Sequence, residues 1–340
     1  MVRDVIGSII SNISRGLRRN LLVCGWFGLG RSFVLRRILK GVKGSSGIIS
    51  VYVDCYRGVY LPSDLRNAFV RAVYSLKNVS DFSRVIECFA SRDLNYALSV
   101  FDDFLDDYGF KIVLGFDEIE FLRRVCRYSE ISSLRDIFRV LLGLRNVYVI
   151  CSCLSTSFLE SFLGDIVKLF NVVKLRFLSR FEALRFIRNV SSRFGVIFSE
   201  EEAFRIFELT QGNPRYIEFF VRDLISPPNR ISAGNFSDLF RKSLVHGLLG
   251  FYVSSIHSRI LELVGNINVC NRVVFEVARG IGSIKEVAER IGRFPQHVSL
   301  VIRKLKDLGV VREISGRLVL SDNVYAEWLR LYFSRSMNIL

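Results

Sequence analysis

Short apolar runs alternate with longer stretches of helical periodicity through the first half of the chain. Five apolar runs are candidate strands, and four of them are rich in β-branched residues: 21–26, 47–55, 110–118, 146–152 and, more weakly, 173–177. Continuous apolar runs are typical of strands covered on both faces, as in a parallel sheet with helical crossovers. Residues 62–108 and 121–143 have helical periodicity with charged faces. The first half therefore predicts an α/β domain.

The pattern changes near Leu178, where consecutive helices replace the alternation. Ser199 and Glu202 have the spacing of a capping box, which predicts the start of the second of these helices. The segment 226–235 holds two of the five prolines and is the strongest linker signal. Beyond it the chain is mostly helical until a β-like stretch at 310–322. These changes predict three parts with bounds 1–177, 178–235 and 236–340.

Composition narrows the classes of protein and partner. Half of the 340 residues are hydrophobic, which excludes a disordered or collagen-like chain. The net charge of +15 points to a polyanionic partner: nucleic acid, nucleotide or an acidic membrane surface. Of the 48 basic residues 10 are Lys and 38 are Arg, whose planar guanidinium suits phosphate. A GC-rich or thermophilic genome would give the same bias.

Neither a membrane span nor a secreted protein is expected. The longest uncharged stretches fall short of the ~18 apolar residues that a span needs. Residues 1–20 predict an amphipathic helix rather than a secretory signal, because an acidic residue comes early and no small-residue cleavage site follows. The seven cysteines contain no CxxC pair, which favours reduced thiols over a disulfide framework or a zinc site. We therefore expect a cytoplasmic protein.

The segment GWFGLGRS, residues 25–32, follows the first candidate strand and precedes a helical stretch. Its spacing is that of the phosphate loop G-x-x-x-x-G-K-[ST], in which backbone N–H groups converge on phosphate oxygens and the following helix adds its dipole. A plain glycine-rich turn is the alternative, and the strand–loop–helix context favours the phosphate loop. Residues expected at the nucleotide are Gly25, Phe27, Gly28, Gly30, Arg31, Ser32 and Phe33, with the Ser32 hydroxyl on Mg²⁺.

Arg31 stands where the phosphate loop has lysine. The substitution keeps the charge but replaces a compact ammonium with a bulkier planar group, so it is not conservative. Nucleotide binding tolerates such a change better than the tight positioning of a γ-phosphate for hydrolysis.

Asp117 and Glu118 come at the end of an apolar strand, in KIVLGFDEIE. Ligands of open α/β sheets bind at the carboxyl ends of the strands. Asp117 is expected to hold Mg²⁺ through water, and Glu118 to orient and deprotonate an attacking water. Adjacent acids also occur as plain helix N-caps, but the phosphate loop upstream favours the catalytic interpretation.

Five segments together resemble the archaeal ATPases of the AAA+/STAND superfamily, relatives of the origin-recognition-type ATPases with a C-terminal winged helix: GWFGLGRS, VYVDC, IVLGFDEIEFL, VYVICS and LTQGNPRYIEFF. The resemblance implies a P-loop NTPase sheet at 1–177, a helical lid at 178–235 and a winged-helix domain at 236–340.

The resemblance also implies two sensor residues. Ser152 corresponds to the residue that senses the γ-phosphate, although an incidental strand serine is the alternative and Ser155 or Thr156 would serve as well. Arg215 corresponds to a second sensor that opens a lid helix, with Pro214 in the turn that aims it. A solvated arginine at a helix start is the alternative. No arginine lies in 146–175, where an arginine finger would be expected, so a finger-driven ring ATPase is not predicted.

Residues 272–322 have the order of a winged helix: two helices, a turn, a recognition-type helix and a hairpin with Gly316 at its tip. A core stripe is expected from apolar residues at helical spacing: Val298, Val301, Ile302, Leu305 and Leu308. DNA contacts are expected from the other faces and the wing: Gln296, His297, Ser299, Arg303, Lys304, Arg312 and Arg317. The alternative is a protein-interaction module whose charged outer face keeps it soluble.

Taken together, the sequence predicts an ATPase or nucleotide-dependent switch that binds ATP or ADP with Mg²⁺ and contacts double-stranded DNA. The alternative is a non-hydrolysing nucleotide-binding or scaffold protein whose winged helix mediates protein contacts. A basic surface that serves RNA or an acidic protein is a third interpretation. A homo-oligomer or a protein partner is compatible with each of them.

Overall fold

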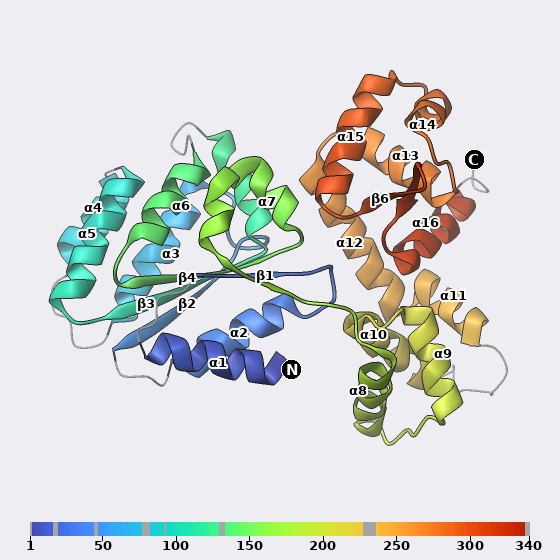
Figure 1. Ribbon diagram of the computed structural model, residues 1–340, viewed down its shortest axis with the longest axis horizontal. Coiled ribbons are helices and arrows are strands. Elements are labelled where there is room, and N and C mark those ends of the chain that lie inside the picture. Colours follow the sequence, from blue (N-terminus) through green and yellow to red (C-terminus); the bar gives the residue numbers. More distant parts are fainter. Residues whose placement is uncertain are drawn as a thin grey trace. The chain divides into compact units, whose positions relative to one another are not determined.

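The computed structural model describes residues 2–15, 20–43, 47–76, 82–91, 93–128, 133–226 and 236–336 (Figure 1). The chain forms two compact units. The first comprises Met1–Gly25 and Gly30–Leu175, and the second comprises Trp26–Leu29 and Arg176–Leu340. The boundary after Leu175 lies close to the predicted one at 177. A further division at 235 stays a prediction, and the predicted linker lies outside the described residues except for Ser226.

A five-stranded sheet forms the centre of the first unit. Its strands are β1 (Leu21–Cys24), β2 (Ile48–Asp54), β3 (Lys111–Asp117), β4 (Val147–Cys153) and β5 (Asn171–Lys174). They lie in the order β2-β3-β4-β1-β5, and each neighbouring pair is parallel. This confirms the predicted parallel sheet. The fifth strand begins two residues before the predicted 173 and, as an edge strand, is largely exposed.

Helices cover both faces of this sheet (Figure 1). One face carries α1 (Val2–Ser14) and α2 (Arg31–Val42), whose apolar sides join the strands in one core that includes Ile13, Leu35 and Ile150. The other face carries the remaining helices of the unit: α3 (Pro62–Tyr74), α4 (Ser83–Ser91), α5 (Leu94–Asp107), α6 (Leu134–Gly143) and α7 (Thr156–Leu163). A short 3₁₀ helix, η2 (Gly164–Leu169), leads to β5.

The predicted helical stretch 121–143 was only partly right. Its first part is a 3₁₀ helix, η1 (Ile119–Arg127), and α6 begins only at Leu134. The tighter winding of η1 buries Ile119, Phe121 and Leu122 together, which a 3.6-residue periodicity does not indicate.

The second unit is mostly helical. It contains α8 (Arg180–Ser192), α9 (Glu200–Thr210), α10 (Pro214–Ile225), α11 (Phe236–His246), α12 (Leu248–Val264), α13 (Ile267–Ala278), α14 (Ile284–Ile291), α15 (Pro295–Asp307) and α16 (Asn323–Ser336). The predicted capping box starts α9, since Glu202 N–H donates to the Ser199 hydroxyl and the Ser199 N–H donates back to Glu202.

Between α15 and α16 an antiparallel hairpin joins β6 (Val311–Ile314) to β7 (Arg317–Leu320). Three helices followed by a hairpin is the order that the sequence predicted. The predicted apolar stripe of α15 is buried, with Val298, Ile302 and Leu305 at most 1% exposed. Gly316 occupies the tip of the hairpin with φ 76°, a conformation that glycine adopts without strain.

None of the helices in the described part of the chain is both long enough and apolar enough to cross a membrane. All seven cysteines carry free thiols, and six of them are buried.

Candidate nucleotide site

The segment Gly25–Ser32, which the sequence predicted as a phosphate loop, joins the end of β1 to the start of α2. Gly28 and Gly30 have φ values of 83° and 91°, which residues with a Cβ rarely adopt. Gly30 is the N-cap of α2, so the loop turns directly into the amino end of a helix. Unpaired N–H groups at such an end, together with the helix dipole, attract anions. The backbone therefore fits a phosphate.

Side chains of this segment differ in their exposure. Ser32 is partly exposed and Phe33 is 63% exposed, so both are open to a ligand at the loop. Arg31 is 5% exposed. Phe27 is 1% exposed and its ring packs beside Trp26, so any nucleotide contact of Phe27 would be made by its backbone.

The carboxylate of Asp117 ends β3 and is already held on both oxygens. Tyr52 donates its hydroxyl to Oδ2 over 2.6 Å, and Ser152 donates its hydroxyl to Oδ1. Tyr52 in turn accepts from the Arg36 guanidinium over 2.8 Å. Asp117 is only 3% exposed. Contact of Asp117 with Mg²⁺ through water stays a prediction.

Ser152 lies at the end of β4 and is fully buried. Besides donating to Asp117, its hydroxyl accepts from the backbone N–H of Glu118 over 2.8 Å. Both bonds orient the acidic end of β3. The structure thus gives Ser152 a positioning role beside the acids, and its contact with a γ-phosphate stays a prediction.

Glu118 adopts a left-handed backbone, with φ 55° and ψ 52°, while being 8% exposed. Such a conformation costs about 1–3 kcal/mol in a residue with a side chain and gathers at functional sites. The strain falls on the residue that the sequence predicted as the water-orienting acid, which strengthens that assignment.

Glu120 is a residue of the site that the sequence analysis missed. It is 1% exposed, and its Oε1 accepts from Arg31 Nη1 over 3.3 Å, while Arg31 Nη2 lies 3.7 Å from Oε1 of Glu118. Burial raises the pKa of Glu120 to about 7, against the lowering effect of Arg31. The sequence did contain a signal for Glu120. It is an acidic residue two positions after Glu118, in a chain that has Arg31 where the phosphate loop has lysine.

Four loop residues, Trp26–Leu29, are held within the second unit. Asn213 caps α10 with its Oδ1 and donates its Nδ2 to the carbonyl of Phe27 over 2.9 Å. A Cβ at Gly28 would collide with Asn213 Oδ1 and would lie 3.0 Å from Arg215 Cβ, so this close approach requires glycine. The predicted GNPR turn is therefore packed on the loop segment, with Pro214 as the first residue of α10.

Arg215 is about half exposed, and its guanidinium pairs with Glu218 over 2.8 Å. The sensor role predicted for Arg215 stays a prediction.

A second attachment of the loop segment runs through Asp322, which directly precedes α16. Its Oδ2 accepts from Trp26 Nε1 and from the Tyr216 hydroxyl, each over 2.6 Å, and its Oδ1 accepts from the Tyr325 N–H over 3.0 Å. Asp322 is 3% exposed, and burial raises its pKa. Neither Asn213 nor Asp322 was predicted as a contact of the loop.

Solved structures share this architecture. The Walker-type ATPase of Pyrococcus abyssi superposes with a TM-score of 0.69 over 95% of this chain and 95% of that chain, at 16% sequence identity. The ORC2 protein of Aeropyrum pernix, in ADPNP–ADP complexes, gives 0.61 over 99% and 94%, at 12% identity. The Aeropyrum pernix ORC1 protein in complex with DNA gives 0.52 over 98% and 94%, at 15% identity.

The fold is that of the P-loop ATPases. This confirms the P-loop sheet that the resemblance implied, whereas the lid and the winged-helix domain stay predictions. At these identities the likeness establishes the fold alone. By sequence, no family model and no curated protein matches the chain.

Beyond the loop, this P-loop ATPase fold carries the predicted DNA contacts on α15 and the hairpin. All seven of them are exposed: Gln296, His297, Ser299, Arg303, Lys304, Arg312 and Arg317. Two are engaged with backbone carbonyls despite their exposure. Lys304 Nζ donates to Val264 over 2.8 Å, and Arg317 donates to Gly280 over 3.3 Å. These two side chains are less suited to a ligand than the sequence suggested.

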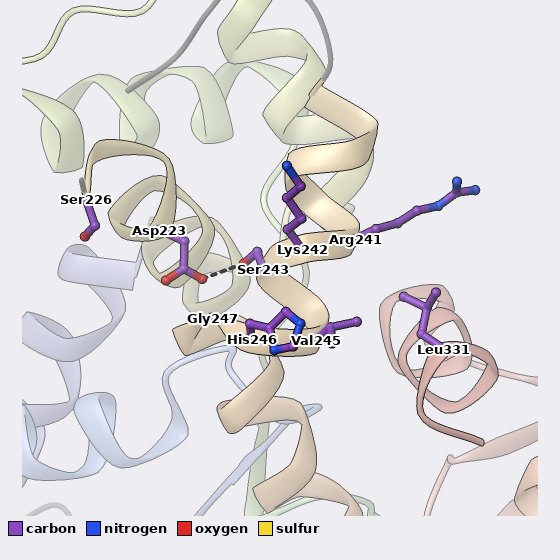
Figure 2. Close-up of a pocket in the computed structure, with 9 residues that line it drawn as sticks. All are labelled: Asp223, Ser226, Arg241, Lys242, Ser243, Val245, His246, Gly247 and Leu331. Atoms are coloured by element: carbon purple, nitrogen blue, oxygen red, sulfur yellow. Dashed lines mark hydrogen bonds between the residues drawn. The ribbon is translucent and has the colours of Figure 1, made fainter. Parts of the chain in front are cut away.

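A pocket of about 600 Å³ lies between α10, α11 and α16 of the second unit, with Arg241, Lys242 and His246 among its lining residues (Figure 2). Its acid, Asp223, bonds to the Ser243 hydroxyl and accepts from the backbone N–H groups of Leu248 and Leu249. Asp223 therefore caps the start of α12 and has a structural role.

Proposed function

We propose that the chain binds ATP or ADP with Mg²⁺ at Gly25–Ser32 and acts as a nucleotide-dependent switch. The observation that carries this proposal is the pair of left-handed glycines that opens α2 after β1, at the sheet edge where β3 ends in Asp117 and Glu118. Backbone, dipole and acids together provide what a magnesium–nucleotide complex requires. A structural neighbour in ADPNP–ADP complexes adds support.

Each residue then has a definite task. Backbone N–H groups of Gly28 and Gly30 cradle the phosphates. The N–H of Gly25, which the sequence also predicted there, already donates to the Cys153 carbonyl over 3.1 Å, so Gly25 takes no such part. Ser32 contacts Mg²⁺ directly, and Asp117 does so through water because both of its oxygens already accept hydroxyl bonds. Glu118 orients the attacking water if hydrolysis takes place. In this proposal the helices of 178–235 are a lid that supplies Arg215.

A non-hydrolysing protein is the second candidate, and the burial of Arg31 favours it. The guanidinium of Arg31 faces Glu118 and Glu120 rather than extending into solvent. Steady-state ATP turnover of the wild type and of Arg31→Lys separates the two candidates. A sharp rise with lysine identifies the natural chain as a slow switch or a pseudo-enzyme, whereas equal turnover removes the basis for the second candidate.

Thermal unfolding with and without millimolar MgATP or MgADP tests nucleotide binding. A ligand at about 100 times its Kd stabilises the folded state by about 2.7 kcal/mol, which raises the Tm by several degrees. Ser32→Ala is expected to reduce the shift when Mg²⁺ is present. Ser157→Ala, an exposed serine of α7, is the matched control and should behave as the wild type. No shift in the wild type at millimolar nucleotide contradicts the proposal.

We also propose that residues 236–340 form a winged-helix domain that contacts double-stranded DNA. The exposed arginines of α15 and the hairpin, Arg303 and Arg312, support this, as does a structural neighbour solved with DNA. Protein contacts through the same surface are the alternative. The buried free thiols are consistent with a cytoplasmic protein.

A further inference from the structure

Both terminal nitrogens of Arg31 face carboxylates of the same unit. Nη1 donates to Oε1 of Glu120 over 3.3 Å, and Nη2 lies 3.7 Å from Oε1 of Glu118. These nitrogens form the fork with which an arginine holds a phosphate or a carboxylate through two bonds. A phosphate that bound through this edge would therefore have to replace the contact of Arg31 with Glu120.

Glu120 is held through only one of its oxygens. Oε1 accepts from Arg31 and also from the backbone N–H of Leu154 over 3.2 Å. Oε2 is buried and has no hydrogen-bond partner among the described residues. A buried oxygen without a partner costs free energy, so the resting pair is incompletely satisfied. A phosphate group, which brings several acceptor oxygens, is a stronger partner for Arg31.

The charges around this pair also oppose an anion. Asp117, Glu118 and Glu120 are all at most 8% exposed, and Arg31 is the buried cation that faces them. The cluster therefore carries excess negative charge when its carboxylates are ionised. At short range and in a low dielectric, one unit of excess charge acts strongly on an incoming polyphosphate.

We propose that Glu120 is an internal competitor for phosphate at Arg31, so that nucleotide binds only by displacing this carboxylate. The inference rests on the proposed nucleotide site and names the residue that sets its affinity. Glu120 is a positioning residue, because it acts through Arg31. In the resting state it satisfies the buried arginine, and it keeps the affinity for nucleotide low.

The test is the affinity for MgATP at pH 8 by titration calorimetry, on the full chain. Glu120→Gln keeps the shape of the side chain and the hydrogen bond from the Leu154 N–H, but it removes the negative charge. We expect this variant to bind MgATP about 10-fold more tightly, which corresponds to one charge-assisted hydrogen bond. Glu160→Gln, an exposed glutamate of α7, is the matched control and should bind as the wild type. Equal or weaker binding by Glu120→Gln overturns the competition.

A second measurement separates charge competition from a general loosening of the site. The same titrations with ATP in EDTA present the more highly charged, metal-free nucleotide. Removing one negative charge should then improve binding by a larger factor than it does for MgATP. A gain that does not depend on Mg²⁺ overturns the charge argument.

If neither the wild type nor any variant binds nucleotide, the proposed function fails. The interaction between Arg31 and Glu120 is then tested by urea unfolding in the absence of nucleotide. Arg31→Gln leaves Glu120 buried and uncompensated, so its urea midpoint at pH 8 should fall further than that of the double variant Arg31→Gln/Glu120→Gln. Additive effects of the two substitutions would show that the two side chains do not interact, and would overturn the inference independently of ATP.

Discussion

Glu120 shows how a single buried carboxylate links the site to pH. Its pKa in the folded protein is about 7, compared with about 4.3 in an unfolded chain. Between these values the folded state binds the additional proton, so the free energy of unfolding falls as pH rises. The groups that face it are Arg31, which opposes the shift, and Glu118, which adds to it.

We expect the wild type to lose up to about 3 kcal/mol of stability between pH 4.5 and 8 through Glu120. Glu120→Gln should remove this part of the pH dependence, measured as the free energy of unfolding in urea at successive pH values. Glu160→Gln provides the comparison, since its curve should parallel that of the wild type. Parallel curves for Glu120→Gln would show that the group does not titrate in this range.

Residues that act locally were predicted from the sequence, and residues that act at long range were not. Gly28, Gly30 and Asp117 were predicted as site residues because a loop spacing and a strand end are visible within a few residues. Glu120 meets Arg31 across 89 positions, and Asn213 meets Phe27 across 186. No periodicity or spacing encodes such pairs, because only the packed fold brings them together.

At the scale of elements, α15 and the hairpin offer a surface on which the predicted DNA contacts can be ranked. All four basic residues are exposed, but Lys304 and Arg317 each donate to a backbone carbonyl, so Arg303 and Arg312 rank first. Sequence position alone could not separate these four residues, since all lie on polar faces of their elements.

We expect Arg303→Ala and Arg312→Ala each to weaken binding to a double-stranded DNA fragment. Each should reduce the slope of log K against log salt by about 1, as expected for the loss of one phosphate contact. Fluorescence anisotropy over a range of salt concentrations measures both quantities. Arg185→Ala, an exposed arginine of α8, is the charge-matched control. Unchanged affinity in both variants would favour a protein-interaction module.

At the scale of the whole molecule, the phosphate loop is divided between the two units. Gly25 and Gly30 belong to the first, while Trp26–Leu29 belong to the second. The sequence predicted the α/β part, the helical part and their boundary near 177, but not this division. Within the second unit, Trp26 bonds to Asp322 across 296 positions, a contact that no local pattern in the sequence indicates.

Trp26→Phe removes the indole donor from Asp322 and leaves the buried carboxylate with the Tyr216 hydroxyl and the Tyr325 N–H. We expect a loss of about 1.5–3 kcal/mol in the free energy of unfolding, the range for a hydrogen bond to a charged group. Asp322→Asn keeps an acceptor oxygen but removes the negative charge. The double variant Trp26→Phe/Asp322→Asn should lose less free energy of unfolding than the sum of the losses in the two single variants. Additive losses would show that Trp26 and Asp322 do not interact.

The position of Trp26 in the loop also allows the loop to be followed by tryptophan fluorescence. The chain has two tryptophans, and the second, Trp328, is 5% exposed and stacks on Tyr325 and Tyr332 in α16. In a Trp328→Phe protein, all indole emission would come from the residue two positions before Gly28. The association and dissociation rates of an unlabelled nucleotide would then be measured in a stopped-flow fluorimeter, with Trp26 as the intrinsic fluorescent reporter.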